Sequence, residues 1–333
     1  MNSELDFEKP IADIEKRIQE LKNFAKEKKV DFTKEIGELE KKARELKKEV
    51  FTRLTAWQRV QIARHIKRPT TLDYIGMCFT DFIELHGDRY FGDDRALIGG
   101  LAKLNGEGVV VIGHQKGRDT KENLQRNFGM PHPEGFRKSL RLMKLAEKFG
   151  KPVVSFIDTP GAYPGLGAEE RGQFEAIARN LREMSMIATP IVVVVIGEGG
   201  SGGALGIGVG DKILMMENAV YFVCTPEACS AILWRDSSKA DVAAEASKIT
   251  AQALLELGVI DEIIPEPLGG AHRDPAVAGE EVKKAILKSL NELREIPKDE
   301  LLERRYEKFH KMGVFLEEEQ EIQRDEAAED KGE

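Results

Sequence analysis

The chain has 333 residues, of which 41% are hydrophobic, and a formal net charge of −8. A chain of this length can bury a large core, and we expect one large α/β domain with appendages. The acidic balance argues against general binding to nucleic acid, so we expect no nucleic-acid partner.

The cysteine, histidine and hydrophobic patterns exclude three further classes. The chain has three cysteines and no C-x-x-C pair, which excludes a disulfide framework and indicates the cytoplasm. Its six histidines lack the spacings of a zinc site, so we expect no metal bound by this chain. The first residues carry acids where a signal peptide carries bases, and no apolar run approaches the ~20 residues that span a bilayer. We therefore expect a soluble cytoplasmic protein that does not bind a membrane.

Residues 1–55 predict a helical hairpin. Apolar residues recur every three or four positions on a Lys/Glu background in both halves of this segment. A break near residues 30–33 separates the two helices, and Asp31 or Thr33 is placed to cap the second one. A seam this narrow cannot fold alone, so we expect the hairpin to pack on its own domain or on a partner.

Residues 56–296 predict the main domain. Short apolar strands alternate with helices from about residue 97, which indicates an α/β fold with a largely parallel sheet. Two strands should pair around Asn105 and Gly106. In chain order we expect strands over 97–104 and 108–114, a helix over 134–149, a strand over 152–157, a helix over 168–186, a strand from 191, strands over 212–216 and 219–223, a helix from 226 and a helix over 240–257.

Residues 297–333 predict a helical and acidic C-terminal tail. Beyond Phe315 and Leu316 the sequence loses its hydrophobic spacing and is rich in acidic residues. Such a segment cannot bury enough apolar surface to fold, so we expect its end to be frayed or disordered.

Two predicted strands are each followed by a glycine-rich loop, where we expect the chemistry. Residues 191–208 read IVVVVIGEGGSGGALGIG, a Val/Ile run typical of a strand buried on both faces, followed by closely spaced glycines. Residues 152–165, PVVSFIDTPGAYPG, repeat this arrangement. Because glycine lets the backbone approach a ligand closely, peptide N–H groups become the functional groups. The two loops predict one site lined by backbone donors.

The second loop also matches two other motifs. The pattern G-x-G-x-x-G from Gly197 to Gly202, with Glu217 downstream, is typical of dinucleotide binding, although the space before Asp211 is short for a crossover helix. As a third interpretation, the loop is a tightly packed turn without chemistry.

The pattern G-x-S-x-G centred on Ser201 is typical of serine hydrolases. Asp261 and His272 follow in the chain order of that class. Glycines this dense would not hold a strained turn rigidly, and we favour a pair of oxyanion holes over all of these interpretations.

Basic residues concentrate between Lys116 and Lys144. Eight basic residues face three acidic ones there, so the stretch carries about +5 and the rest of the chain about −13. Either this is a solvated helix face, or it attracts a phosphorylated ligand or an acidic protein. On the second interpretation the substrate-binding candidates are Lys116, Arg118, Arg137 and Arg141.

The chain resembles a known family. The segment from the second glycine loop through KIL to AVYFVCTPEA is similar to the crotonase superfamily. Over about residues 5–310 the chain resembles the α subunits of multisubunit acetyl-CoA carboxylase carboxyltransferases. This resemblance rests on LDFEKPI, LDYIG, FIDTPGAYPG, GAEERGQ, EGGSGGAL and IPEPLGGAHR.

The resemblance implies a crotonase-like fold of ββα units behind an N-terminal helical hairpin. It implies transfer of a carboxyl group from carboxybiotin, held on a biotin carboxyl carrier protein and not on this chain, to acetyl-CoA, giving malonyl-CoA for fatty-acid synthesis. Coenzyme A is then part of a substrate. The partners implied are a zinc-carrying β subunit in an α2β2 assembly, the carrier protein and biotin carboxylase.

Such a transfer develops negative charge on the ureido oxygen and on the thioester oxygen, and both need preorganised donors. We predict the catalytic donors to be the peptide N–H groups of Gly161, Ala162, Gly202 and Gly203. The biotin-contacting residues are predicted to be Gly199, Gly200 and Ser201. No protein base is required if the biotin anion takes the α-proton.

Two other functions remain open on the sequence. A hydratase or isomerase of the crotonase type needs a glutamate over the acyl carbon, for which Glu169, Glu170 and Glu198 are candidates. Glu169 and Glu170 equally suit the first turn of a helix, where carboxylates are favoured. A scaffold role for the hairpin is the non-catalytic alternative.

Overall fold

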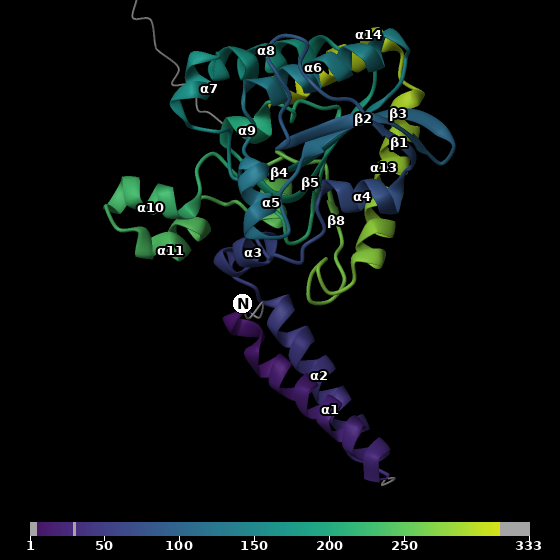
Figure 1. Ribbon diagram of the computed structural model, residues 1–333, viewed down its shortest axis with the longest axis vertical. Coiled ribbons are helices and arrows are strands. Elements are labelled where there is room, and N and C mark those ends of the chain that lie inside the picture. The colour runs from purple at the N-terminus through teal and green to yellow at the C-terminus, as the bar shows by residue number, and fades with distance from the viewer. Residues whose placement is uncertain (1–4, 29–30, 314–333) are drawn as a thin grey trace, which may run out of the picture.

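A mixed β-sheet forms the centre of the molecule, for which we use a computed structural model that describes residues 5–28 and 31–313 (Figure 1). Within these residues eight strands run in the order β1-β2-β3-β4-β5-β6-β8, and β7 pairs with β5 off this path. The strands are β1 Thr80–Glu84, β2 Leu97–Leu104, β3 Glu107–His114, β4 Val153–Thr159, β5 Ile191–Gly200, β6 Lys212–Met216, β7 Val220–Phe222 and β8 Glu262–Ile264.

The strand directions confirm the predicted α/β fold. Strands β1, β2 and β3 pair antiparallel, and every pair from β3 to β8 is parallel. The predicted pair over 97–114 is β2 and β3, joined by Asn105 and Gly106 at φ 51° and 86°. Two positive φ angles in a two-residue loop match the twist of the strands. Strand β1 was not predicted; three of its five residues are exposed, which leaves no alternating pattern to detect.

Helices surround the central strands, and β4 and β5 are buried along their whole length. In Figure 1, α6, α8 and α14 lie above the sheet, and α4 and α13 lie to its right. The helices of this body are α3 Ala56–Ala63, α4 Thr71–Cys78, α5 Thr120–Gln125, α6 Pro133–Lys148, α7 Leu166–Glu170, α8 Gln173–Met186, α9 Ser201–Leu205, α10 Pro226–Trp234, α11 Ala240–Ala246, α12 Ala251–Glu256, α13 Pro275–Arg294 and α14 Lys298–His310, with 3-10 turns at Asp6–Glu8, Asn127–Gly129 and Ser237–Lys239.

Two predicted helices were wrong in their continuity. The helix expected over 168–186 is broken into α7 and α8 by Gly172, whose φ is 81°. The helix expected over 240–257 is broken into α11 and α12, where Lys248 has φ 53° and the Thr250 side chain caps α12. Thr250 also forms a β-bridge to Val220, so a tertiary contact interrupts an otherwise helical sequence.

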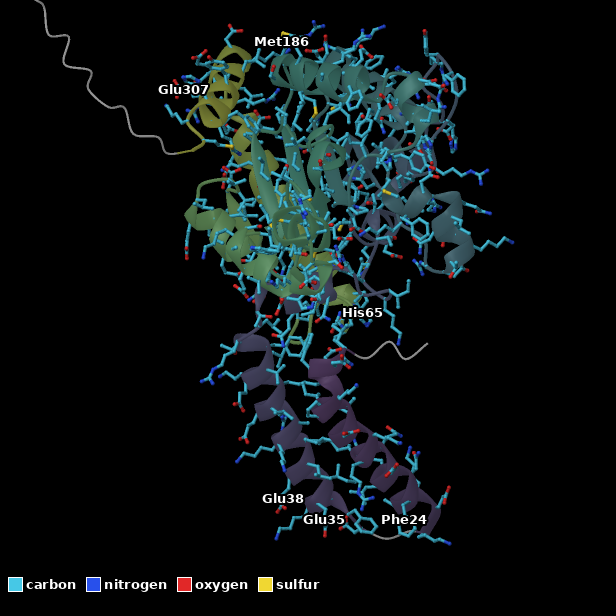
Figure 2. All side chains as sticks on the ribbon, turned by 90° about the vertical axis from the view of Figure 1, so that its left-hand side faces the viewer. Phe24, Glu35, Glu38, His65, Met186 and Glu307 are labelled. Atoms are coloured by element: carbon cyan, nitrogen blue, oxygen red, sulfur yellow. The ribbon has the colours of Figure 1, made fainter. Side chains whose placement is uncertain are left out.

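The N-terminal hairpin consists of α1 (Lys9–Lys28) and α2 (Thr33–Thr52), and it extends away from the sheet. The N-cap position of α2 is Phe32, which makes no side-chain cap, so neither Asp31 nor Thr33 is the N-cap; the carboxylate of Asp31 does accept the N–H of Thr33, the first residue of the helix. At the base of the hairpin, Ile11 and Phe51 pack against Ile62 of α3, so the hairpin packs on its own domain there. Figure 2 shows Phe24, Glu35 and Glu38 near the far end of the hairpin.

The predicted C-terminal tail contains α14, and the part expected to be disordered falls on residues 314–333, outside the described residues.

Candidate active site

Strands β4 and β5 place both glycine loops at one edge of the sheet. The two strands are parallel neighbours, and Thr159 at the end of β4 pairs with Gly199 near the end of β5. Gly199 and Gly200, predicted as loop residues, are the last two residues of β5. A Cβ on Gly200 would lie 2.2 Å from the carbonyl oxygen of Pro160, so only glycine fits there. The first loop therefore crosses directly over the end of β5.

The four predicted donors come together at this edge. A Cβ on Gly203 would lie 2.4 Å from the carbonyl carbon of Gly161 and 2.6 Å from the nitrogen of Ala162. The two loops thus contact each other backbone to backbone and lie at one site, as the sequence predicted. Gly202 is different, because its Cβ would meet only the Ile177 side chain at 3.4 Å.

The N–H groups of these four residues are not equally available. The N–H of Gly161 donates to Oγ1 of Thr159 at 3.1 Å. The N–H of Ala162 has no acceptor among the residues that the structure describes. Gly202 and Gly203 lie in the first turn of α9, where N–H groups lack intrahelical partners. Gly202 is partly exposed and Gly203 is buried, which leaves Ala162 and Gly202 as the accessible donors.

Ser201 is the first residue of α9, directly after β5, and is exposed, with φ 52°. A non-glycine residue in this left-handed region is strained, and such strain is typical of functional sites. The proposed hydrolase partners lie elsewhere. Asp261 accepts the N–H of Ile213 near the amino end of β6, and His272 stacks on His65 at 3.9 Å. No triad is assembled at Ser201, and α9 has five residues where a dinucleotide-binding crossover needs a long helix.

His114 was missed by the sequence analysis and joins the two loops. Its Nε2 donates to the carbonyl oxygen of Gly203 at 3.1 Å, and its Nδ1 accepts the N–H of Asp158 at 3.4 Å. Burial lowers the pKa of His114 to about 3, so the ring is neutral. Its only sequence signal was its place at the end of β3, the strand beside β4.

A chain of charged groups lies under the loops. Nζ of Lys116 lies 2.7 Å from Oδ1 of Asp158 and 2.8 Å from Oε2 of Glu198. Nε of Arg64 lies 2.6 Å from the other carboxylate oxygen of Glu198, and Arg64 also pairs with Glu227 on α10. These partners are separated by 40 or more positions in sequence, so no local pattern pointed to them.

The hydratase candidates do not have the features of a general acid. Glu169 and Glu170 are exposed on α7. Burial acts to raise the pKa of Glu198, but Lys116 and Arg64 outweigh it and hold that pKa below its usual value. Glu198 is therefore ionised and occupied by two cations.

The other basic candidates are scattered around the domain. Arg118 pairs with Asp73. Arg137 and Arg141 line a cleft of about 530 Å³ between α6, α8 and the segment around Tyr90. Nη1 of Arg137 is buried there without an acceptor among the described residues, and its guanidinium lies 5.2 Å from the centre of the Tyr90 ring. Lys116 is separate from this cleft.

An apolar cavity of about 390 Å³ opens beside Ser201 and Gly202. Its walls come from β6, β7, α12 and the end of α14, and include Leu205, Tyr221, Val223, Leu254, Phe309 and Met312. Tyr221 is the one lining residue with an ionisable oxygen, and burial raises its pKa to about 12. The cavity therefore provides an apolar surface and backbone donors, but no side chain that would gain or lose a proton near neutral pH.

Two further properties concern metals and membranes. Over residues 5–28 and 31–313, no three His, Cys, Asp or Glu side chains are grouped so that they could hold a metal ion. In the same part of the chain no helix has the length and apolar character needed to cross a membrane.

Sequence comparison identifies close relatives. A family model described as acetyl co-enzyme A carboxylase carboxyltransferase-like matches residues 4–313. A protein of Bacillus cereus (strain G9842) named acetyl-coenzyme A carboxylase carboxyl transferase subunit alpha is 60% identical over 311 residues, covering 93% of this chain and 96% of the relative. A Geobacter metallireducens protein with the same name is 58% identical over 314 residues, with 94% and 98% covered.

Solved structures share the fold at low identity. The Pseudomonas malonate decarboxylase hetero-tetramer in complex with coenzyme A has a chain with a TM-score of 0.53 and 16% identity, covering 65% of this chain and 86% of that one. Transcarboxylase 12S, with methylmalonyl-coenzyme A and methylmalonic acid bound, gives 0.51 and 20%, with 62% and 40% covered. These likenesses confirm the crotonase-like fold. With the match in sequence over residues 4–313, they lead to one conclusion: the chain belongs to the family of acetyl-CoA carboxylase carboxyl transferase α subunits and is a carboxyl-transferring subunit of that enzyme.

Proposed function

We propose that this chain acts with a β subunit to transfer a carboxyl group from carboxybiotin, carried by a biotin carboxyl carrier protein, to acetyl-CoA, giving malonyl-CoA for fatty-acid synthesis. The observation that carries the proposal is the contact between the two glycine loops, where Gly203 lies against the peptide that joins Gly161 and Ala162. Two loops that meet in this way place peptide groups of two elements side by side, and we assign accessible N–H groups of both loops to one substrate oxygen. This is the arrangement that stabilises a developing oxyanion.

Ala162 and Gly202 are the donors we assign to this oxyanion hole. Both are accessible, the N–H of Ala162 has no acceptor among the described residues, and Gly202 lies in the first turn of α9. Gly161 and Gly203 shape the hole, because Gly161 donates to Thr159 and Gly203 packs on the first loop. A second hole for the other substrate oxygen then comes from the β subunit.

The cavity beside Gly202 fits the biotin side of the reaction. Carboxybiotin supplies an activated carboxyl group when it is bound. Ser201 and Gly202 line the cavity, while Gly199 and Gly200 form the end of β5, where a Cβ on Gly199 would meet the Tyr221 ring at 2.5 Å. The chain positions the ring, excludes water with apolar walls and donates hydrogen bonds. Its cavity has no carboxylate, imidazole or amine to move a proton.

An exposed apolar surface next to the cavity fits the β subunit. Val223, Ile232 and Leu233 are 87%, 75% and 63% exposed on and beside α10. Exposed apolar patches mark protein interfaces. We assign this surface, the α10 surface, to the β subunit of an α2β2 assembly in which β holds the zinc and most of the acyl-CoA. The carrier protein and biotin carboxylase complete a cytoplasmic complex.

The basic residues of the cleft fit an anionic group of a partner or substrate. Arg137 has a buried nitrogen without an acceptor, and Arg141 lines the same cleft. We assign this cleft to the phosphates of coenzyme A or to acidic side chains of the carrier protein.

A valine at Gly202 tests the oxyanion hole. Gly202→Val should lower kcat by about 10²-fold to 10³-fold and change KM for acetyl-CoA less, because the lost stabilisation belongs to the transition state. Gly37→Val is the matched control, since a Cβ on Gly37 in α2 meets nothing within 4 Å. The measurement is steady-state carboxyl transfer with β, beside a thermal melt. A Gly202→Val variant that melts and turns over like the parent would show that the loop is only a tight turn.

A further inference from the structure

We infer that Lys116 is a positioning residue for carboxyl transfer. It joins Asp158 of β4 to Glu198 of β5 and so fixes the spacing of the two donor loops that follow these residues. The inference rests on the proposed oxyanion hole and goes beyond it, because Lys116 acts through the carboxylates of the two strands that precede the loops.

The geometry of this Lys116 bridge is compact. Its ammonium nitrogen lies within 2.8 Å of one oxygen from each carboxylate. The N–H of Glu198 also donates to Oδ1 of Asp158 at 3.0 Å, which joins the same two strands through the backbone. Asp158 precedes Gly161 by three residues, and Glu198 precedes Gly202 by four. The bridge therefore lies at the base of both loops.

The charges explain why the bridge holds. The carboxylates of Asp158 and Glu198 are only 8% and 5% exposed, and two buried carboxylates side by side repel each other. Burial acts to lower the pKa of Lys116, but the two carboxylates outweigh it and raise that pKa, so the amine stays protonated. Removing one member of a buried ionic cluster is strongly destabilising, because it leaves a buried charge without its partner.

Other groups face the same carboxylates. Arg64, at the end of α3, pairs with Glu198 and with Glu227 of the α10 surface. Arg68, which follows α3, pairs with Glu266 and donates to the carbonyl oxygen of Ile196 in β5. His114 is neutral and accepts the N–H of Asp158. Lys116 is the one cation among the described residues within ion-pair distance of both carboxylates.

The loops have little tolerance for a change in this spacing. Gly203 lies so close to the Gly161–Ala162 peptide that even a Cβ would collide with it. A shift of β5 against β4 therefore moves Gly202 relative to Ala162. A misplacement of about 1 Å costs about 10²-fold in rate when donors must meet a reacting atom.

The structure provides a matched control at the opposite end of β5. Arg305 of α14 is buried and pairs with Asp211, and Asp211 accepts the N–H of Ile191, the first residue of β5. Loss of either ionic cluster lowers stability, but only the Lys116 bridge lies at the loops. Arg305→Met thus separates lost stability from lost positioning.

The test measures kcat and KM from pH 5.5 to 8.5 for the complete complex with β, below the melting temperature of each variant. Lys116→Met should lower kcat by about 10²-fold at pH 8 with a smaller change in KM. Its kcat should partly recover as the pH falls, because a proton shared by the two carboxyl groups lets one donate a hydrogen bond to the other and removes their repulsion. Arg305→Met should lower the melting temperature, with kcat within about twofold of the parent and no such recovery.

A second variant protects the test against a Lys116→Met protein that fails to fold. Lys116→Met with Glu198→Gln removes one charge of each sign and leaves no repelling pair. It should fold, keep the reduced kcat and lose the recovery at low pH. Parental kcat in this double variant, or parental kcat with an unchanged pH profile in folded Lys116→Met, would overturn the inference. If the complex of the parent chain with β showed no carboxyl transfer, the proposed function would be overturned as well.

Discussion

His114 shows how one buried side chain fixes the geometry of both loops. It holds the carbonyl group of Gly203 through Nε2 and the N–H of Asp158 through Nδ1. These two contacts require a neutral ring with its proton on Nε2. A protonated ring would lose the bond from Asp158, because both of its nitrogens would then be donors.

The pH dependence of stability should report this neutral state. The folded pKa of His114 is about 3, below the value of about 6.5 for an unfolded histidine. Between these values the unfolded chain binds more protons, so this stability is complete above pH ~6.5 and is lost as the pH falls, by at most about 1.4 kcal/mol per pH unit. Denaturant unfolding between pH 7.5 and 5 should show a steeper loss for the parent than for His114→Gln. Exposed His310→Gln is the control, and equal slopes for the parent and His114→Gln would contradict the assignment.

At this scale the sequence predicted the loops and missed what supports them. Gly203 lies against Gly161 and Ala162 because the carboxyl ends of parallel strands meet at one edge, which the sequence pattern predicted. The partners of Lys116 were not predictable, since an ion pair between distant positions follows from the order of the strands. The count of charges along the sequence placed Lys116 in a basic stretch, but in the structure its side chain is largely buried and pairs with two carboxylates.

Helix α10 contributes little to the core and exposes apolar side chains to solvent. It buries only Pro226 and Ser230 and leaves Ile232 and Leu233 in solvent. In Figure 1, α10 and α11 project from the left of the body. The first residues of α10 include Glu227, which pairs with Arg64, so the α10 surface is also joined to the charged chain under the loops.

Charges on the α10 surface should prevent association with β. Ile232→Asp with Leu233→Asp places two carboxylates where an apolar interface requires burial, which costs several kcal/mol of binding. We expect a folded chain that no longer elutes with β in size-exclusion chromatography. Met186→Asp is the control, because Met186 is exposed at the top of the molecule in Figure 2, away from α10. Undiminished association of the double variant would move the interface elsewhere.

Helix α6 carries the basic cleft, and its charge should act on substrate encounter. Arg137→Glu with Arg141→Glu should raise KM for acetyl-CoA or for the carrier protein at low salt and reduce the salt dependence of KM. The reason is that attraction between the cleft and an approaching anion is screened over about 8 to 10 Å at ordinary ionic strength. Arg182→Glu serves as the control, because the Arg182 side chain on α8 is exposed and does not line the cleft. Unchanged KM at low salt would leave the cleft as a solvated helix face.

Element boundaries were predicted where local signals decide them. Pro226 begins α10 as predicted, and α6 begins at Pro133, one residue before the predicted start, as proline at the first helical positions favours. The breaks at Gly172 and at residues 247–250 escaped prediction for different reasons. Gly172 has a positive φ, which cannot be predicted from a glycine inside a helical pattern. The second break depends on the bridge from Thr250 to Val220, which is a tertiary contact.

At the scale of the whole molecule, the sheet positions the part of the active site that we assign to this chain. The sheet brings both loops to one edge, and the apolar cavity and the α10 surface lie beside them. Alternation of strands and helices predicted the α/β class, and the family resemblance predicted the crotonase-like arrangement. The strand order was beyond the sequence, because pairings such as β5 with β7 depend on contacts across the entire domain.

The most direct test of this account is carboxyl transfer by the purified chain with and without its β subunit. Malonyl-CoA formation would be measured with the carrier protein in its carboxylated form, and complex formation by size-exclusion chromatography on the same samples. The account predicts no turnover by either subunit alone and full turnover by the mixture, because each contributes one oxyanion hole. Robust malonyl-CoA formation by this chain alone, or none by an assembled mixture, would contradict it.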